Sequence, residues 1–182
     1  MRSGEKLAWP QFVYNLLYPA ILGSMLYDVL KEAFYLEAFG VAKLLVIAFY
    51  CLDYLHLHSH LKTNMPESTT IPRMLIDSAI AVLIGVAYWQ VSFEGFDRSM
   101  YCLLAVSILI LAYPLPRYLR TWPYYGSNTV LLLLVFGMFL FVKLHGITSS
   151  WCMPFVYGTP MAWYAFHVFW ISRRIGQRTA NN

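Results

Sequence analysis

Residues suited to chemistry are concentrated in one short stretch of the chain, from Tyr50 to His60, which holds an aspartate and three histidines. On an α-helix, where successive side chains are about 100° apart, Asp53, His56 and His60 fall within about 60° of one another. His58 points about 140° away from Asp53 and leaves that stripe. A strand would align the three histidines instead, but an open strand edge cannot face lipid. The sequence therefore predicts a helix with one polar stripe.

The stripe supports two kinds of chemistry inside a membrane. Aspartate carries charge and histidine titrates near neutral pH, so together they can form part of a proton or cation pathway. The same groups bind zinc, iron or copper, and Asp53, His56 and His60 would then be the ligands of a transition metal. The plain alternative is that lipid headgroups solvate the histidines at the end of a helix.

The elements that carry these residues are long apolar segments. The chain has 182 residues, of which 59% are hydrophobic and 12% charged, and its mean hydropathy is +0.55. A soluble domain has roughly 25% charged residues, and a helix needs about 20 apolar residues to cross a bilayer. We predict an all-α polytopic membrane protein, a single-domain bundle of six transmembrane helices with short connections and no separate soluble domain. The predicted spans are 9–28, 39–58, 71–92, 99–117, 128–144 and 151–172.

Basic residues in the short connections predict the orientation of the bundle. With both termini on one side, nine lysines and arginines share that side: Arg2, Lys6, Lys62, Arg73, Arg117, Arg120, Arg173, Arg174 and Arg178. The opposite side holds four: Lys31, Lys43, Arg98 and Lys143. The excess predicts cytoplasmic termini, and it relates the net charge of +4 to topology and to anionic lipid in the bilayer. No basic tract is long enough for a nucleic-acid footprint, so we expect no nucleic-acid partner.

Polar residues in three other predicted spans lie at the cytoplasmic depth of Asp53. Asp77 is in the third span, His167 is in the sixth, and Asn15 is a secondary candidate in the first. Ionisable residues inside membranes usually face the bundle interior and mark ion or proton pathways. We therefore expect Asp53, Asp77 and His167 to meet in one polar cavity that opens toward the cytoplasm. For Asp77 the alternative is an ion pair with Arg73, one turn earlier.

Two more secondary candidates, Asp28 and Glu32, follow the first span on the opposite side. Carboxylates four residues apart on a helix repel each other slightly unless a cation lies between them. A solvated helix face is the plain alternative for this pair.

Motifs for several other activities are missing from the sequence. It contains no P-loop, GxGxxG, GxSxG, HExxH or CxxC pattern, which removes support for nucleotide-driven transport, serine hydrolysis and zinc peptidase activity.

Three function classes remain open. The preferred one is a cation or proton pathway, in which Asp53 and Asp77 supply charge and His56 and His167 titrate. Six short spans would need a homo-oligomer or a membrane-complex partner to build such a pathway. The second class is an accessory or assembly subunit that acts by helix packing. The third is a membrane-embedded metal or haem enzyme, in which the ligands are Asp53, His56, His60 and His167.

Overall fold

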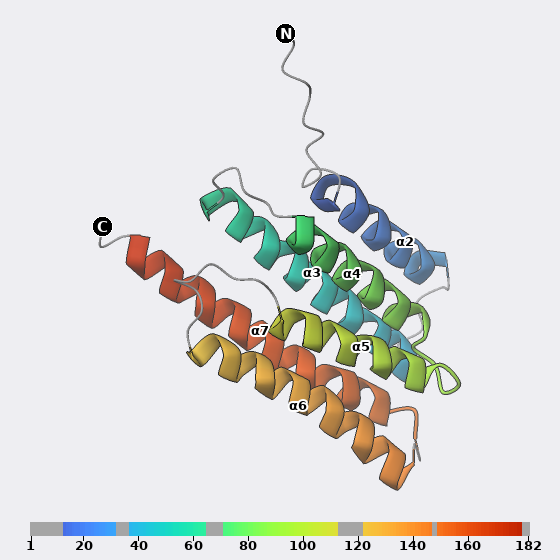
Figure 1. The fold of residues 1–182 in the computed structure, drawn as a ribbon. Coiled ribbons are helices and arrows are strands. Elements are labelled where there is room, and N and C mark those ends of the chain that lie inside the picture. The colour runs from blue at the N-terminus through green and yellow to red at the C-terminus, as the bar shows by residue number, and fades with distance from the viewer. Residues whose placement is uncertain (1–12, 32–36, 65–70, 113–121, 147–148, 180–182) are drawn as a thin grey trace.

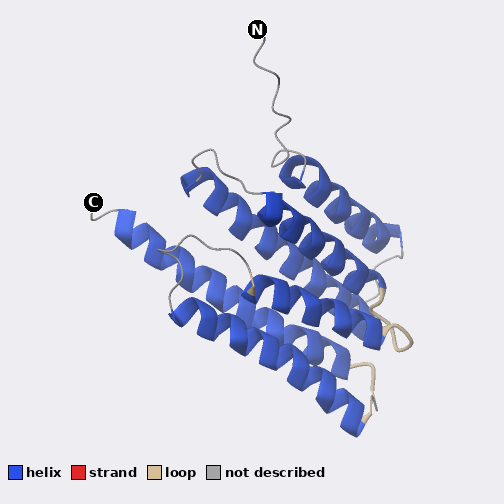
Figure 2. Cartoon of the chain, in the orientation of Figure 1, coloured by secondary structure: helices blue, strands red, loops and turns tan. Residues whose placement is uncertain are grey.

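The computed structural model describes residues 13–31, 37–64, 71–112, 122–146 and 149–179, with the backbone alone at 56–64, 71, 122–124 and 171–179. Every described element is a helix, joined by loops and turns (Figure 2). The elements are η1 (Val13–Leu17), α2 (Tyr18–Lys31), α3 (Ala38–Asn64), α4 (Ile71–Trp89), α5 (Phe96–Leu111), α6 (Trp122–His145) and α7 (Cys152–Thr179).

The predicted all-α class is confirmed, whereas the number of membrane crossings is supported only in part. Among the described residues, four helices are long and apolar enough to cross a membrane: Val13–Lys31, Ala38–Leu55, Pro72–Trp89 and Tyr125–His145. By contrast, α5 has 16 residues, fewer than the roughly 20 that a straight crossing needs. The helical interpretation of the histidine-rich stretch is also confirmed, because α3 continues without a break from Ala38 to Asn64.

Successive helices run in opposite directions and lie side by side (Figure 1). The five helices from α3 to α7 form a closed ring. Each packs against the next one in the chain, and α7 packs against α3. The remaining helix, α2, lies outside the ring along α3 and α4. Figure 1 shows the C-terminal ends of α3 and α7 at the same end of the bundle as the beginning of α4.

The beginning of the first helix is irregular for a local reason. Pro19 has no N–H to donate, and a proline ring inside a helix displaces the carbonyl one turn earlier. The chain takes up this disturbance as a π-helical turn, Val13–Leu17, directly before α2. The rings of Tyr14 and Tyr18 are stacked with their centroids 6.1 Å apart, and both side chains are buried. Tyr14 in this turn and Tyr18 at the start of α2 thus both point toward the neighbouring helices.

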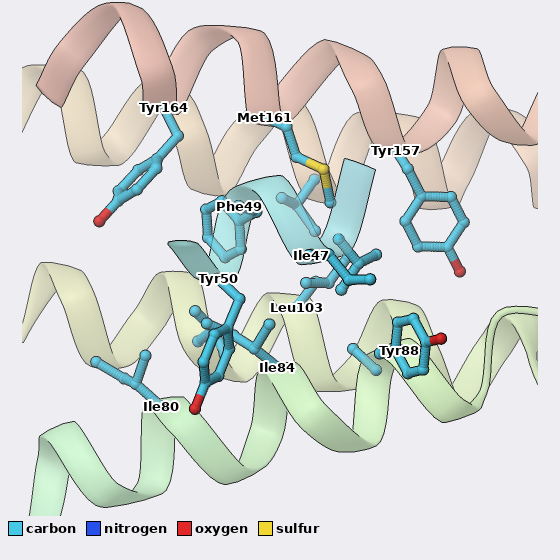
Figure 3. Packing of buried hydrophobic residues seen from close by; sticks show 14 of the residues in the cluster. Ile47, Phe49, Tyr50, Ile80, Ile84, Tyr88, Leu103, Tyr157, Met161 and Tyr164 are labelled. Atoms are coloured by element: carbon cyan, nitrogen blue, oxygen red, sulfur yellow. The ribbon is translucent and has the colours of Figure 1, made fainter. Parts of the chain in front are cut away.

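Large apolar side chains fill the space between α3, α4, α5 and α7 (Figure 3). Ile47, Ile84, Leu103 and Met161 come from these four helices and are all buried. Burial of a side chain of this size contributes about 1.5–3 kcal/mol in water, and within a membrane the close packing itself provides the attraction. Polar groups are therefore confined to a few places in this bundle, and these places are the candidate sites.

Candidate functional site

Asp53 lies where three helices meet. Its side chain is 3% exposed, and each of its two carboxyl oxygens accepts a hydrogen bond from a tyrosine. The Tyr18 hydroxyl on α2 donates to Oδ2 at 2.9 Å, and the Tyr164 hydroxyl on α7 donates to Oδ1 at 2.8 Å. Inside an apolar bundle these donors replace the water that a carboxyl group would otherwise require. Asp53 therefore joins α2, α3 and α7 through hydrogen bonds alone.

Asp77 belongs to the same group of side chains. It is fully buried on α4, and its Oδ2 accepts a hydrogen bond from the Tyr14 hydroxyl on η1. Its backbone carbonyl accepts a second bond from the Tyr18 hydroxyl, at 3.4 Å. Because the Tyr18 hydroxyl also donates to Asp53, a single hydroxyl group lies between the Asp53 side chain and the Asp77 main chain. The structure thus brings together the two aspartates that the sequence places at one depth.

More tyrosines surround these carboxyl groups. The Tyr50 hydroxyl donates to the carbonyl of Tyr18 at 3.1 Å, and the rings of Tyr50 and Tyr54 lie 5.1 and 5.5 Å from that of Tyr18. We define the tyrosine–aspartate cluster as Tyr14, Tyr18, Tyr50, Asp53, Asp77 and Tyr164. Sequence analysis missed its tyrosines. The available signal was the spacing of four residues between Tyr14 and Tyr18, which places both on one helical face.

The cluster differs from the predicted open cavity. Both carboxyl groups are buried, so in this conformation the site is closed rather than open to one end of the bundle. His167 is buried as well, three residues after Tyr164 and therefore on the same side of α7. His167 is thus one turn of α7 away from Tyr164, a member of the cluster.

The predicted metal stripe is only partly visible. His56 and His60 belong to the helical part of α3, but their side chains lie outside the described residues. Within the described part of the chain, no three His, Cys, Asp or Glu side chains are grouped closely enough to hold a metal ion. The geometry at Asp53 thus consists of two hydroxyl donors, with no described metal ligands beside it.

The secondary candidates have different environments. Asn15 is exposed and does not join the cluster, although its neighbour Tyr14 does. Asp28 has a cation beside it, one of the two alternatives that the sequence left open, because Lys43 Nζ lies 3.2 Å from its Oδ2. The Tyr88 hydroxyl donates to the same oxygen at 2.9 Å. Glu32 lies outside the described residues.

No protein-family model, curated protein or solved structure matches the chain. What the protein does must therefore be inferred from the chemistry of its own residues. A carboxylate can only accept hydrogen bonds, whereas a protonated carboxyl group and a tyrosine hydroxyl both donate and accept. The tyrosine–aspartate cluster is thus an array of groups able to pass a proton between them, enclosed by apolar side chains.

Proposed function

We propose that this chain is a six-span integral membrane protein that conducts protons through Asp53 and Asp77. The observation that carries the proposal is the buried tyrosine–aspartate cluster. A charged residue within a membrane costs up to about 2.5–3.5 kcal/mol, the value for the centre of a helix, and residues that lie within the membrane despite this cost usually serve a pathway. Two such residues on neighbouring helices, both with hydroxyl groups beside them, fit a proton relay better than isolated structural charges.

The six-span topology is supported by the nine-to-four excess of basic residues and by the alternating directions of the helices (Figure 1). It places both termini and the cluster at the cytoplasmic end. The test uses a variant whose three cysteines are replaced by alanine, with Ser59→Cys or Asn181→Cys added. A membrane-impermeant maleimide should label both positions from the cytoplasmic side, and labelling from opposite sides would contradict the topology.

Protons fit the site because each oxygen of Asp53 lies at hydrogen-bonding distance from a tyrosine hydroxyl group, which can both donate and accept. The sequence supplies a histidine on both helices, since His56 follows Asp53 by one turn of α3 and His167 follows Tyr164 by one turn of α7. In this mechanism a histidine delivers a proton from the cytoplasm to the Asp53 carboxylate. Protonated Asp53 then gives this proton to the Tyr18 oxygen, while the original hydrogen of the Tyr18 hydroxyl group leaves for the Asp77 carboxylate.

Proton flux into liposomes tests the proposal directly. The purified protein is reconstituted around a pH-sensitive dye, and a pH gradient is imposed with a potassium-clamped potential. We expect Asp53→Asn to lower the rate at least tenfold, because an amide cannot take up and release the proton. Ser107→Ala is the control, since Ser107 is also buried but bonds only the Leu103 carbonyl of its own helix. A wild-type protein without flux, or equal flux in Asp53→Asn, would contradict the proposal.

The second candidate is an accessory subunit, and one observation favours it. Asp53 ties three helices together with both of its oxygens saturated, as a purely structural joint would do. The exposed apolar side chains on α6, among them Leu133 and Phe136, would then face lipid, a second copy of the chain or a partner protein. In that case Asp53→Asn would lower the melting temperature and the yield of an isolated complex, while no proton flux would be found in the wild-type protein.

A further inference from the structure

One face of α4 connects the tyrosine–aspartate cluster with the opposite end of the bundle. Asp77, Ala81, Ile84 and Tyr88 follow one another at intervals of four, three and four residues, which repeat one side of an α-helix. All four side chains are completely buried. The face that begins with the Asp77 carboxyl group therefore ends with the Tyr88 hydroxyl.

At that far end Tyr88 enters a second polar cluster, which consists of Asp28, Lys43 and Tyr88. The Tyr88 hydroxyl lies 2.9 Å from Asp28 Oδ2 and 3.0 Å from the Met25 carbonyl oxygen, so its one hydrogen is shared between these two acceptors. Lys43 Nζ lies 3.2 Å from the same carboxyl oxygen and 5.4 Å from the centre of the Tyr88 ring. The three residues come from α2, α3 and α4, the helices that also carry Tyr18, Asp53 and Asp77.

The two clusters are separated by similar lengths of all three helices. From Tyr18 to Asp28 and from Lys43 to Asp53 there are ten residues, and from Asp77 to Tyr88 there are eleven. At 1.5 Å per residue each interval is about 15–17 Å, or half of a hydrocarbon core roughly 30 Å thick. The contact zone of α2, α3 and α4, which we call the seam, thus has polar groups at two levels.

Between these levels the seam is apolar. Met25, Val46, Ala81 and Ile84 lie there, one or two from each helix, and none of them is exposed. Gly85 lets α2 and α4 approach closely, since a Cβ atom at this position would lie 3.1 Å from Ile21 Cγ2. Protons do not cross a dry apolar layer of this depth, so passage would require the layer to open.

We infer that Asp28, Lys43 and Tyr88 form a second proton-binding site, through which the proton that has occupied Asp53 and Asp77 is exchanged with water at the opposite face. The inference rests on the proposed function and locates its pathway in the seam. A proton that reaches the Asp28 carboxylate displaces the Lys43 ammonium group, and the ion pair re-forms when the proton passes to water. Tyr88 holds the carboxyl group to α4 throughout. Among the described residues, Lys31, one turn later on α2, is a second charged group near Asp28 besides Lys43.

A second ion pair near the same end of the bundle provides the matched control. Lys143 Nζ on α6 lies 2.6 Å from Asp97 Oδ2 on α5, away from the seam. Its two side chains are 46% and 42% exposed, against 17% and 31% for those of Lys43 and Asp28. Asp97→Asn therefore removes the same charge at a comparable depth without touching the proposed pathway.

The experiment is the liposome flux assay with Asp28→Asn, Asp97→Asn and Tyr88→Phe. We expect Asp28→Asn to lower the rate at least fivefold and Asp97→Asn to leave it unchanged. Tyr88→Phe keeps the ring beside Lys43 but removes the hydroxyl, and should lower the rate two- to threefold; it also tests the site if Asp28→Asn does not fold.

The outcomes separate the two proposals. Wild-type rates in both Asp28→Asn and Tyr88→Phe, with flux still lost in Asp53→Asn, would overturn the second site and leave the proposed function standing. Equal losses in Asp28→Asn and Asp97→Asn would also overturn it, because the effect would then be one of surface charge. No flux in the wild-type protein would overturn both.

Discussion

The two ends of the seam hold their carboxyl groups by different means. Asp53 is 3% exposed and receives two neutral hydroxyl groups, whereas Asp28 is 31% exposed and shares one oxygen between an ammonium and a hydroxyl group. A buried charge must be hydrogen-bonded or ion-paired to be tolerated. Asp53 is hydrogen-bonded to neutral groups, and Asp28 is ion-paired with Lys43. Neutral donors allow Asp53 to gain a proton without loss of an ion pair. At Asp28 every proton taken up must break one.

If the proposed pathway operates, this difference predicts an order of events. Protonation at the Asp53 end changes the pattern of hydrogen bonds that tie α2 to α3 and α7, since a protonated carboxyl oxygen no longer accepts as before. Because α2 lies outside the ring and is held there mainly by α3 and α4, it is the helix best placed to move. Movement of α2 would open the apolar layer and expose Asp28 to the arriving proton.

The largest effect is expected from fixing α2 to α4 across the apolar layer. In a background without native cysteines, Ile21→Cys and Gly85→Cys would place two thiols close together, because the Gly85 Cβ position lies 3.1 Å from Ile21 Cγ2. A disulfide needs Cβ atoms about 3.5–4.5 Å apart, and a Cβ atom at 85 in contact with a γ atom of residue 21 is compatible with that separation. We expect oxidation of the double variant to stop proton flux almost completely and a reductant to restore it. The measurement is the liposome assay before and after reduction.

The two single cysteine variants are the controls for this cross-link, and oxidation should leave their flux unchanged. Full flux in the oxidised double variant, with the disulfide verified by mass spectrometry, would show that the two ends communicate without separation of α2 from α4.

A smaller effect is expected from removal of the hydroxyl groups at the Asp53 end. Tyr18→Phe deletes the donor to both Asp53 and the Asp77 carbonyl, while Tyr164→Phe deletes one donor to Asp53. Interhelical hydrogen bonds in membranes contribute about 0.6 kcal/mol on average and up to about 1.7 kcal/mol. For a chain of this size, 1 kcal/mol corresponds to a shift of about 2–4 °C in Tm. We expect Tyr18→Phe to lower Tm by about 3–6 °C and Tyr164→Phe by about half as much.

Thermal unfolding in detergent, followed by a thiol-reactive dye or by circular dichroism, measures these shifts. Tyr27→Phe is the matched control, because Tyr27 is on the same helix as Tyr18 but is 68% exposed. Equal shifts in all three variants would mean that the hydroxyl groups around Asp53 do not hold the helices together.

Local sequence properties were sufficient to predict the type of fold. Charge-free apolar runs of about 20 residues can only be helices in lipid, and α3, α4, α6 and α7 cover most of the predicted spans. Of the predicted fourth span, 99–117, residues 99–111 belong to α5, which begins at Phe96 and ends at Leu111, and residues 113–117 lie outside the described part of the chain. Its start follows the turn at 90–95, in which the Gly95 N–H donates a hydrogen bond to Ser92 Oγ at 2.9 Å. A Cβ atom at Gly95 would lie 2.4 Å from the Gln90 carbonyl oxygen, and hydropathy does not register such a local restriction.

The candidate site was predictable only in its charged members. Asp53 and Asp77 stand out because they interrupt apolar runs, so their burial could be expected from the sequence. Their hydroxyl partners are 35, 63 and 111 residues away along the chain, and tyrosine does not disturb an apolar pattern. Which tyrosines meet an aspartate is decided by helix packing, and no local rule contains this information. The pairing of Lys43 with Asp28 was hidden in the same way, although both residues were placed at the same side.

The smallest effect should distinguish the two ion pairs of the far end. Exposed pairs contribute about 0.2–1 kcal/mol at most, and the Lys143–Asp97 pair is nearly half exposed. Lys43 is more buried and also faces the Tyr88 ring, so its removal leaves Asp28 with less compensation. We expect Lys43→Met to lower Tm by about 2–4 °C, equivalent to about 1 kcal/mol, and Lys143→Met by less than about 1 °C. Methionine keeps most of the apolar side chain in both variants, so the comparison isolates the charge.

Salt provides a second test of the same difference. Because salt screens exposed charges more than buried ones, 1 M salt should abolish the small effect of Lys143→Met on Tm and retain most of the effect of Lys43→Met. Equal costs at the two lysines would remove the distinction between the seam and the rest of the far end, and with it the reason to place the second site there.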